Sequence, residues 1–74
     1  MTVGQEMRKA REKRGLTQLQ VAEKLGKTQP TVASWEADDS SPHADEIRDV
    51  AFVYGLRPEQ LLPPRKLTAP RKSA

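Results

Sequence analysis

Residues 17–36 of the chain read Thr-Gln-Leu-Gln-Val-Ala-Glu-Lys-Leu-Gly-Lys-Thr-Gln-Pro-Thr-Val-Ala-Ser-Trp-Glu, and this stretch decides the fold. Thr17 and Thr28 each stand where a helix needs an N-cap, and a glutamine follows each of them. Gly26 lies between the two capped segments, where a tight turn requires a positive φ. The pattern therefore predicts two short helices joined by a tight turn.

Each of these two segments has one apolar face. Val21 and Leu25 lie four residues apart in the first segment, and Val32 and Trp35 lie three apart in the second. This spacing predicts that Trp35 packs in the core rather than against a nucleic-acid base. Ala22 is small enough to let the two helices cross closely. Such a unit is a helix-turn-helix, which holds its second helix outward, where it can enter a DNA major groove.

Outside this unit, apolar residues at spacings of three and four predict three more helices. In residues 44–54 they form an apolar stripe of Ala44, Ile47, Val50, Ala51 and Tyr54. Gly15 and Gly55 end two of them, and Pro58 suits the first turn of the last. We expect a compact all-α domain of five short helices over residues 1–62. The expected helices cover residues 4–14, 18–25, 29–36, 44–54 and 58–62. Residues 63–74 are basic and rich in proline, and we expect them to form a disordered tail.

The composition limits the classes of protein and site to be considered. A chain of 74 residues suits one small domain. It has no cysteine, which excludes disulfides and thiolate metal sites and fits a reducing cytoplasm. His43 is the only histidine, so we expect no metal, no cofactor and no enzymatic activity. No apolar run approaches the roughly 18 residues of a membrane span, and we expect no membrane partner.

Charge is divided unevenly along the predicted domain. Residues 1–30 carry a net charge of +4, and residues 31–62 carry a net charge of −5. A basic half beside an acidic half predicts that one side of the domain binds a polyanion such as nucleic acid.

The motifs taken together resemble the phage-repressor and Cro family, also called the XRE family, over about residues 3–62. The matching segments are Gly15-Leu16-Thr17-Gln18, Val21-Ala22-x-x-Leu25-Gly26, Thr28-Gln29-Pro30-Thr31-Val32, Trp35-Glu36 and Gly55-Leu56-x-Pro58-Glu59-x-Leu61-Leu62. The resemblance implies a five-helix domain that binds operator DNA, usually as a two-fold dimer. It also implies an internal ion pair between an arginine of the first helix and a glutamate ending the third, here Arg11 and Glu36.

The resemblance and the residue types together give a set of candidate DNA contacts. The candidates for base readout are Gln29, Pro30, Thr31 and Ser34. The candidates for phosphate contact are Gln18, Lys27, Thr28, Arg8 and Arg14. A glutamine can bond N6 and N7 of adenine together, whereas basic side chains and helix beginnings attract phosphate. A solvated side chain is the simpler alternative for Gln29, Thr31, Ser34, Lys27, Arg8 and Arg14, and for Thr28 it is helix capping.

Three residues depart from the family pattern. Asp38 stands where a glycine is usual, and it must then adopt the left-handed conformation. Its carboxylate and that of Asp39 would lie near a phosphate and repel it. Lys27 replaces an apolar turn residue, and its ammonium could reach a phosphate. Phe52 replaces a polar residue, and it is either a dimer contact or part of a satellite core.

We therefore expect a sequence-specific regulator of transcription that binds double-stranded DNA. The favoured form is a small repressor or autoregulator that binds a palindromic operator in the major groove as a homodimer. The alternative is an antitoxin-like interaction module whose main partner is another protein. The acidic half, from Asp38 to Glu59, would then form the contact surface.

Overall fold

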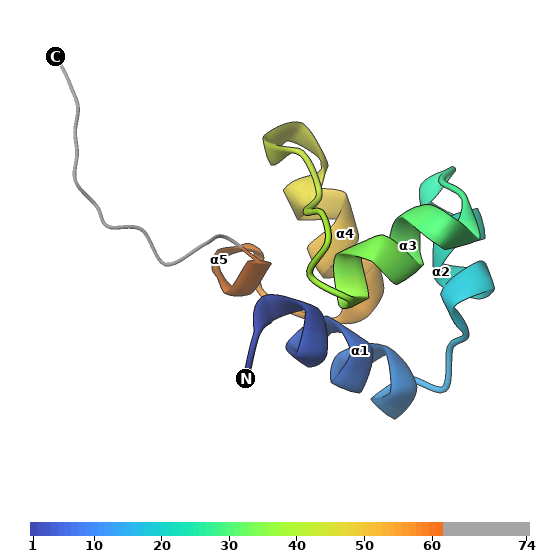
Figure 1. The fold of residues 1–74 in the computed structure, drawn as a ribbon, viewed down its shortest axis with the longest axis horizontal. Coiled ribbons are helices and arrows are strands. Elements are labelled where there is room, and N and C mark those ends of the chain that lie inside the picture. The colour runs from blue at the N-terminus through green and yellow to red at the C-terminus, as the bar shows by residue number, and fades with distance from the viewer. Residues whose placement is uncertain (62–74) are drawn as a thin grey trace, which may run out of the picture.

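The computed structural model describes residues 1–61 and shows an all-α fold, as predicted. Figure 1 shows the arrangement of its elements. The helices are α1 (Val3–Lys13), α2 (Gln18–Leu25), α3 (Gln29–Glu36), α4 (Ile47–Tyr54) and α5 (Pro58–Leu61), with the 3-10 turn η1 (Ala44–Glu46) before α4. The expectations for Leu62 and for the tail fall outside the described residues. No helix within residues 1–61 has the length and apolar character needed to cross a membrane.

Two of the helices begin with the same reciprocal cap. Thr17 Oγ1 accepts a hydrogen bond from the backbone N–H of Gln20, and the Gln20 side chain accepts one from the backbone N–H of Thr17. Thr2 and Gln5 make the same exchange at the beginning of α1. Each exchange satisfies backbone donors that have no partner within the helix, which fixes where the helix begins.

Thr28 occupies the N-cap position of α3, but the predicted side-chain cap is absent. Pro30 at the second helical position has no N–H to offer, and the N–H of Thr31 already bonds to the Thr28 carbonyl. The Thr28 hydroxyl lies 3.0 Å from the Thr31 hydroxyl instead. The prediction that the Thr28 side chain caps α3 is therefore wrong.

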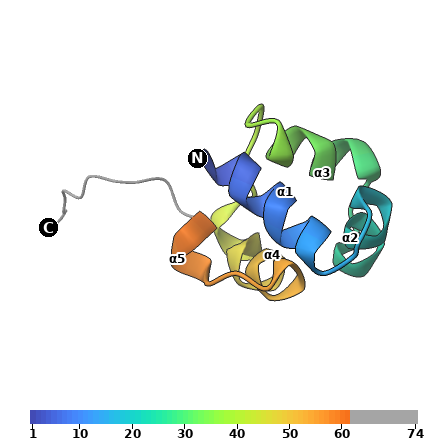
Figure 2. The same cartoon turned by 90° about the horizontal axis from the view of Figure 1, so that it is seen from below.

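The core lies where α1, α2, α3 and α4 meet, and Figure 2 shows α1 between α3 and α4. Its buried apolar side chains come from all five α-helices and include Trp35, which confirms the core placement predicted for it. They are Met7, Val21, Ala22, Val32, Trp35, Ile47, Val50, Ala51, Tyr54 and Leu61. Burying a large aliphatic side chain contributes about 1.5–3 kcal/mol, so this cluster is the main source of stability.

The region before and within α4 differs in part from the prediction. The expected helix over residues 44–54 is divided, because the first turn is the 3-10 turn η1 and the α-helix begins at Ile47. Ala44 is therefore exposed rather than part of the apolar stripe. Phe52 is 83% exposed, so the satellite-core interpretation is wrong.

The beginning of α1 packs against the end of α3. A Cβ atom added to Gly4 would lie 2.5 Å from the Glu36 carbonyl oxygen, so only glycine allows this approach. Asp38 adopts a φ of 64°, as predicted, and its carboxylate turns toward α1. It accepts hydrogen bonds from the Thr2 hydroxyl at 2.6 Å and the Gly4 N–H at 2.9 Å. Asp38 thus fastens the turn after α3 to α1.

Candidate nucleic-acid interface

A buried ion pair joins α1 to the end of α3. Arg11 Nε lies 2.8 Å from Glu36 Oε2, and Arg11 Nη2 lies 3.0 Å from Glu36 Oε1. The side chain of Arg11 is 11% exposed and that of Glu36 is 3% exposed. The pair implied by the resemblance is thus present, in the bidentate geometry that binds a carboxylate most strongly.

The Glu36 carboxylate is held ionised by its neighbours. Burial acts to raise the pKa of Glu36, but hydrogen bonds from Arg11, Tyr54 and Gln18 outweigh it and hold the pKa below its ordinary value. The Tyr54 hydroxyl donates to Glu36 Oε2 at 2.7 Å. Burial, followed by the bond to Glu36, raises the pKa of Tyr54. At neutral pH the site therefore combines a carboxylate with a neutral phenol.

Hydrogen bonds continue from this buried carboxylate to the exposed beginning of α3. Gln18 Nε2 donates to Glu36 Oε1 at 3.1 Å, and Gln29 Nε2 donates to Gln18 Oε1 at 2.7 Å. Gln18 is half-buried and Gln29 is exposed. The two glutamines that open α2 and α3 are therefore held side by side at the surface.

The same two glutamines line a shallow open hollow. Its lining residues come from α1, α2 and α3, and they are Arg8, Arg11, Thr17, Gln18, Leu19 and Gln29. Arg8 Nε lies 3.3 Å from Glu12 Oε2, and both side chains are more than half exposed. The structure thus brings three predicted contact residues, Arg8, Gln18 and Gln29, to one place.

The other predicted contacts of α3 lie beside this group. Pro30 and Thr28 are exposed, and Thr31 is half-buried. Ser34 is also half-buried, and its hydroxyl accepts a hydrogen bond from the Ser40 hydroxyl at 2.9 Å. A serine with a partner in the following loop is less free to contact a base than the exposed side chains of the first turn.

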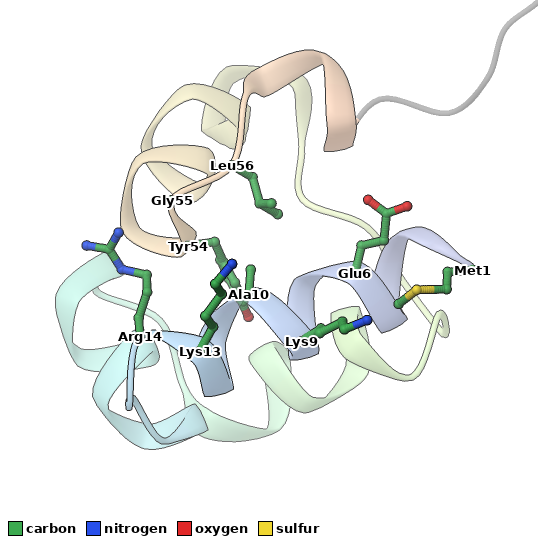
Figure 3. A pocket seen from close by; sticks show the side chains of 9 residues that line it. All are labelled: Met1, Glu6, Lys9, Ala10, Lys13, Arg14, Tyr54, Gly55 and Leu56. Atoms are coloured by element: carbon green, nitrogen blue, oxygen red, sulfur yellow. The ribbon is translucent and has the colours of Figure 1, made fainter.

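Two predicted phosphate contacts, Lys27 and Arg14, contact other parts of the domain. Lys27 forms an ion pair with Glu46 of η1, so an acid already neutralises its charge. The hydrogen bond from Lys27 is the main cause that lowers the pKa of Glu46. Arg14 lies over the turn after α4, because a Cβ atom added to Gly55 would lie 2.6 Å from Arg14 Nη1. Figure 3 shows Arg14 at a second hollow, between α1 and the turn from α4 to α5. The structure does not bring Arg14 to the group around Gln29.

Comparison with protein families identifies the arrangement. A family model described as helix-turn-helix matches residues 7–61, which is most of the chain. The chain belongs to the helix-turn-helix family of phage-repressor type. Across residues 1–61, no three histidines, cysteines, aspartates or glutamates group together in a way that could hold a metal ion.

Two similar proteins extend this family assignment. The chain is 31% identical over 62 residues to the HTH-type transcriptional regulator ImmR of Bacillus subtilis strain 168. The match covers 84% of this chain but 49% of ImmR, so the chain spans about half the length of that relative. The fold matches a crystal structure of the P22 c2 repressor in complex with a synthetic operator, with a TM-score of 0.78 and 19% identity. That match covers 84% of this chain and 94% of the c2 chain.

Within this helix-turn-helix domain, two polar contacts are not predicted by the sequence. The apolar stripe of α4 predicts that Tyr54 is buried, but it does not predict a partner for the Tyr54 hydroxyl. A buried tyrosine hydroxyl usually needs one, and that requirement was the available signal. No local sequence pattern predicts the contact of Asp38 with Thr2 and Gly4, because 34 to 36 residues separate the partners in sequence. The expectation that Asp38 repels a phosphate does not allow for these two donors.

Proposed function

We propose that this chain is a sequence-specific regulator of transcription that binds double-stranded DNA. It acts as a small repressor or autoregulator on a palindromic operator, to which it binds as a homodimer with α3 in the major groove. The observation that carries the proposal is the bonded pair of Gln18 and Gln29 at the exposed beginning of α3.

The two glutamines suit different parts of DNA. Gln29 is exposed on the first turn of α3, and its amide carries the donor and acceptor that adenine requires in the major groove. Gln18 begins α2, where free backbone N–H groups and the positive end of the helix dipole favour a phosphate. Arg8 lines the same hollow and adds a positive charge. Phosphate contacts would thus fix the register, and α3 would read the bases.

The comparisons support the wider part of the proposal. ImmR is described as a transcriptional regulator, and the c2 repressor was crystallised with a synthetic operator. A domain this small contacts only a few base pairs. Two copies related by a two-fold axis would read two half-sites about one helical turn apart, which is why we propose a homodimer on a palindrome.

Selection from random DNA sequences tests the proposal. At about 50 and 200 mM salt, we expect a palindromic site to be enriched and its affinity to fall steeply as salt rises. In Gln29→Ala the preference at one position per half-site should weaken by about 1–3 kcal/mol, with the other positions unchanged. An unchanged preference profile would transfer readout to Thr31 and Ser34. A failure to enrich any sequence would overturn the proposal.

A second candidate function is an antitoxin-like module whose main partner is a protein, and the exposure of Phe52 favours it. Phe52 is 83% exposed on α4, in a groove that Asp45 and Asp49 also line. In this case DNA binding should be weak and insensitive to salt. Phe52→Ser should leave monomer stability within about 0.5 kcal/mol, because no core contact is lost. If Phe52→Ser leaves operator affinity and the concentration dependence of binding unchanged, Phe52 is not the dimer contact of the first candidate.

A further inference from the structure

The Glu36 carboxylate uses all of its accepting capacity on neighbouring side chains. Glu36 Oε2 accepts from Arg11 Nε at 2.8 Å and from the Tyr54 hydroxyl at 2.7 Å. Glu36 Oε1 accepts from Arg11 Nη2 at 3.0 Å and from Gln18 Nε2 at 3.1 Å. An ionised carboxylate has two oxygens with about four lone-pair sites, and it donates nothing. Every group that contacts Glu36 must therefore be a donor.

This requirement fixes the orientation of the Gln18 amide. Only its NH2 group can face Glu36, because the opposite orientation would place the carbonyl oxygen against an anionic oxygen. The carbonyl oxygen Oε1 of Gln18 must then point the other way, toward α3. There it accepts from Gln29 Nε2 at 2.7 Å, the shorter of the two bonds that Gln18 makes.

The orientation passes from Gln18 to Gln29 in the same way. Because Gln18 offers only a carbonyl oxygen at this point, Gln29 must turn its NH2 group inward. One N–H of Gln29 is used in that bond, which leaves its carbonyl oxygen and its second N–H for a ligand. Adenine presents one donor, N6–H, and one acceptor, N7, in the major groove, and these match the two free groups.

We propose that Glu36 is a positioning residue for base readout. Its buried charge, relayed by Gln18, determines which end of the Gln29 amide faces the DNA and so strengthens the preference for adenine. This inference rests on the proposed function, since it assumes that Gln29 contacts a base. It adds a residue of the core, far from any base, to the determinants of specificity.

The main test is Gln18→Met, which cuts the relay and leaves the pair between Arg11 and Glu36 in place. Gln29 then regains the freedom of a long side chain, which must be lost again when it binds adenine. Contacts with the other bases do not depend on holding the Gln29 side chain in this orientation. The preference for adenine at the Gln29 position should therefore fall by about 2- to 10-fold, with other positions unchanged. Uniform weakening on all sequences would show that Gln18 serves only a phosphate, and would overturn the proposal.

Tyr54→Phe is the matched control, because it removes a donor from the same carboxylate but leaves Gln18 in place. We expect a lower denaturation midpoint and an unchanged base preference. If Tyr54→Phe relaxes the preference as much as Gln18→Met does, general loosening of the core explains both, and the relay is wrong.

A measurement on the free protein separates this inference from the proposed function. In an amide correlation spectrum of the ¹⁵N-labelled domain, the Gln29 side-chain proton that bonds to Gln18 should be shifted downfield of its position in a solvent-exposed glutamine amide. Gln18→Met should return this proton to the position of a solvent-exposed amide, whereas Tyr54→Phe should not. Unchanged Gln29 resonances in Gln18→Met would overturn the relay even if DNA binding is normal. If instead Gln29→Ala leaves base preference intact, the proposed function of Gln29 fails, whatever the spectrum shows.

Discussion

The two ends of α3 differ in how the rest of the molecule holds them. At the carboxyl end, Trp35 and Glu36 are buried, and Glu36 is bound by side chains from three other helices. At the amino end, Gln29 and Pro30 are exposed, and one side-chain bond, from Gln29 to Gln18, ties this turn to α2. Stability is thus concentrated at one end of the helix, and the surface available for recognition lies at the other.

The largest effect should come from breaking the buried pair at the carboxyl end. Arg11→Met and Glu36→Leu each leave a buried charge unpaired, which should cost about 3–5 kcal/mol of unfolding free energy. The double variant should lose much less than the sum of the two. A domain of this size has only about 3–5 kcal/mol in total, so unfolding is best followed in an osmolyte that favours the folded state.

The exposed pair of Arg8 and Glu12 provides a matched control. Removing either partner of an exposed pair four residues apart in a helix should cost about 0.3–0.5 kcal/mol. Equal losses at the two pairs, or no coupling between Arg11 and Glu36, would contradict the large effect expected at the carboxyl end of α3.

A smaller effect should appear when stability is measured against pH. The pKa of Glu36 is lowered in the folded state, so its contribution is full above the unfolded value of about 4.3 and is lost as pH falls through the folded value. The pKa of Tyr54 is raised, so its contribution is full below about 10 and is lost as pH rises above that value. Melting temperatures should therefore be constant in between and fall in acid and in alkali.

Tyr54→Phe separates the two titrations. It should reduce the loss of stability in alkali, because the phenol that resists ionisation is gone, and leave the loss in acid. If the alkaline loss in Tyr54→Phe equals that of the unmodified chain, the hydroxyl of Tyr54 does not contribute through its ionisation.

The smallest effect on stability is expected at Arg8 of α1, which lines the same hollow as Gln29 at the amino end of α3. Arg8→Gln should lower the unfolding free energy by at most about 0.5 kcal/mol. If Arg8 contacts a phosphate, the slope of log affinity against log salt should become shallower by about 0.9. Arg14→Gln removes the same charge at the other hollow and should leave the slope unchanged. The reverse result would restore Arg14 as the phosphate contact and remove Arg8.

The parts of the fold that the sequence could predict are those with local causes. Thr17, Gly26 and Gly55 determine helix ends through bonds and backbone angles within a few residues, and the structure has them as expected. Val32 and Trp35 are buried, as their spacing predicts. The outcome at Thr28 is also local, because the N–H of Thr31 bonds to the Thr28 carbonyl and the two hydroxyls bond to each other, so the Thr28 side chain does not cap α3.

The contacts that the sequence could not predict join distant segments. Lys27 pairs with Glu46 and Arg14 lies over Gly55, and neither contact follows from helix periodicity. A charge on the sequence says nothing about which acid will lie beside it after folding. For this reason the basic half of the chain is a poor guide to where its free positive charge lies.

Trp35 is the only tryptophan in the chain, and it is 4% exposed beside Glu36 on α3. Its fluorescence therefore reports on one helix alone, without any added label. Emission should lie at short wavelength while α3 is seated on the core, and move to longer wavelength when water reaches the indole. A variant that loses DNA affinity but keeps this emission has lost a contact with DNA. A variant whose emission shifts has lost the packing of α3 against the core.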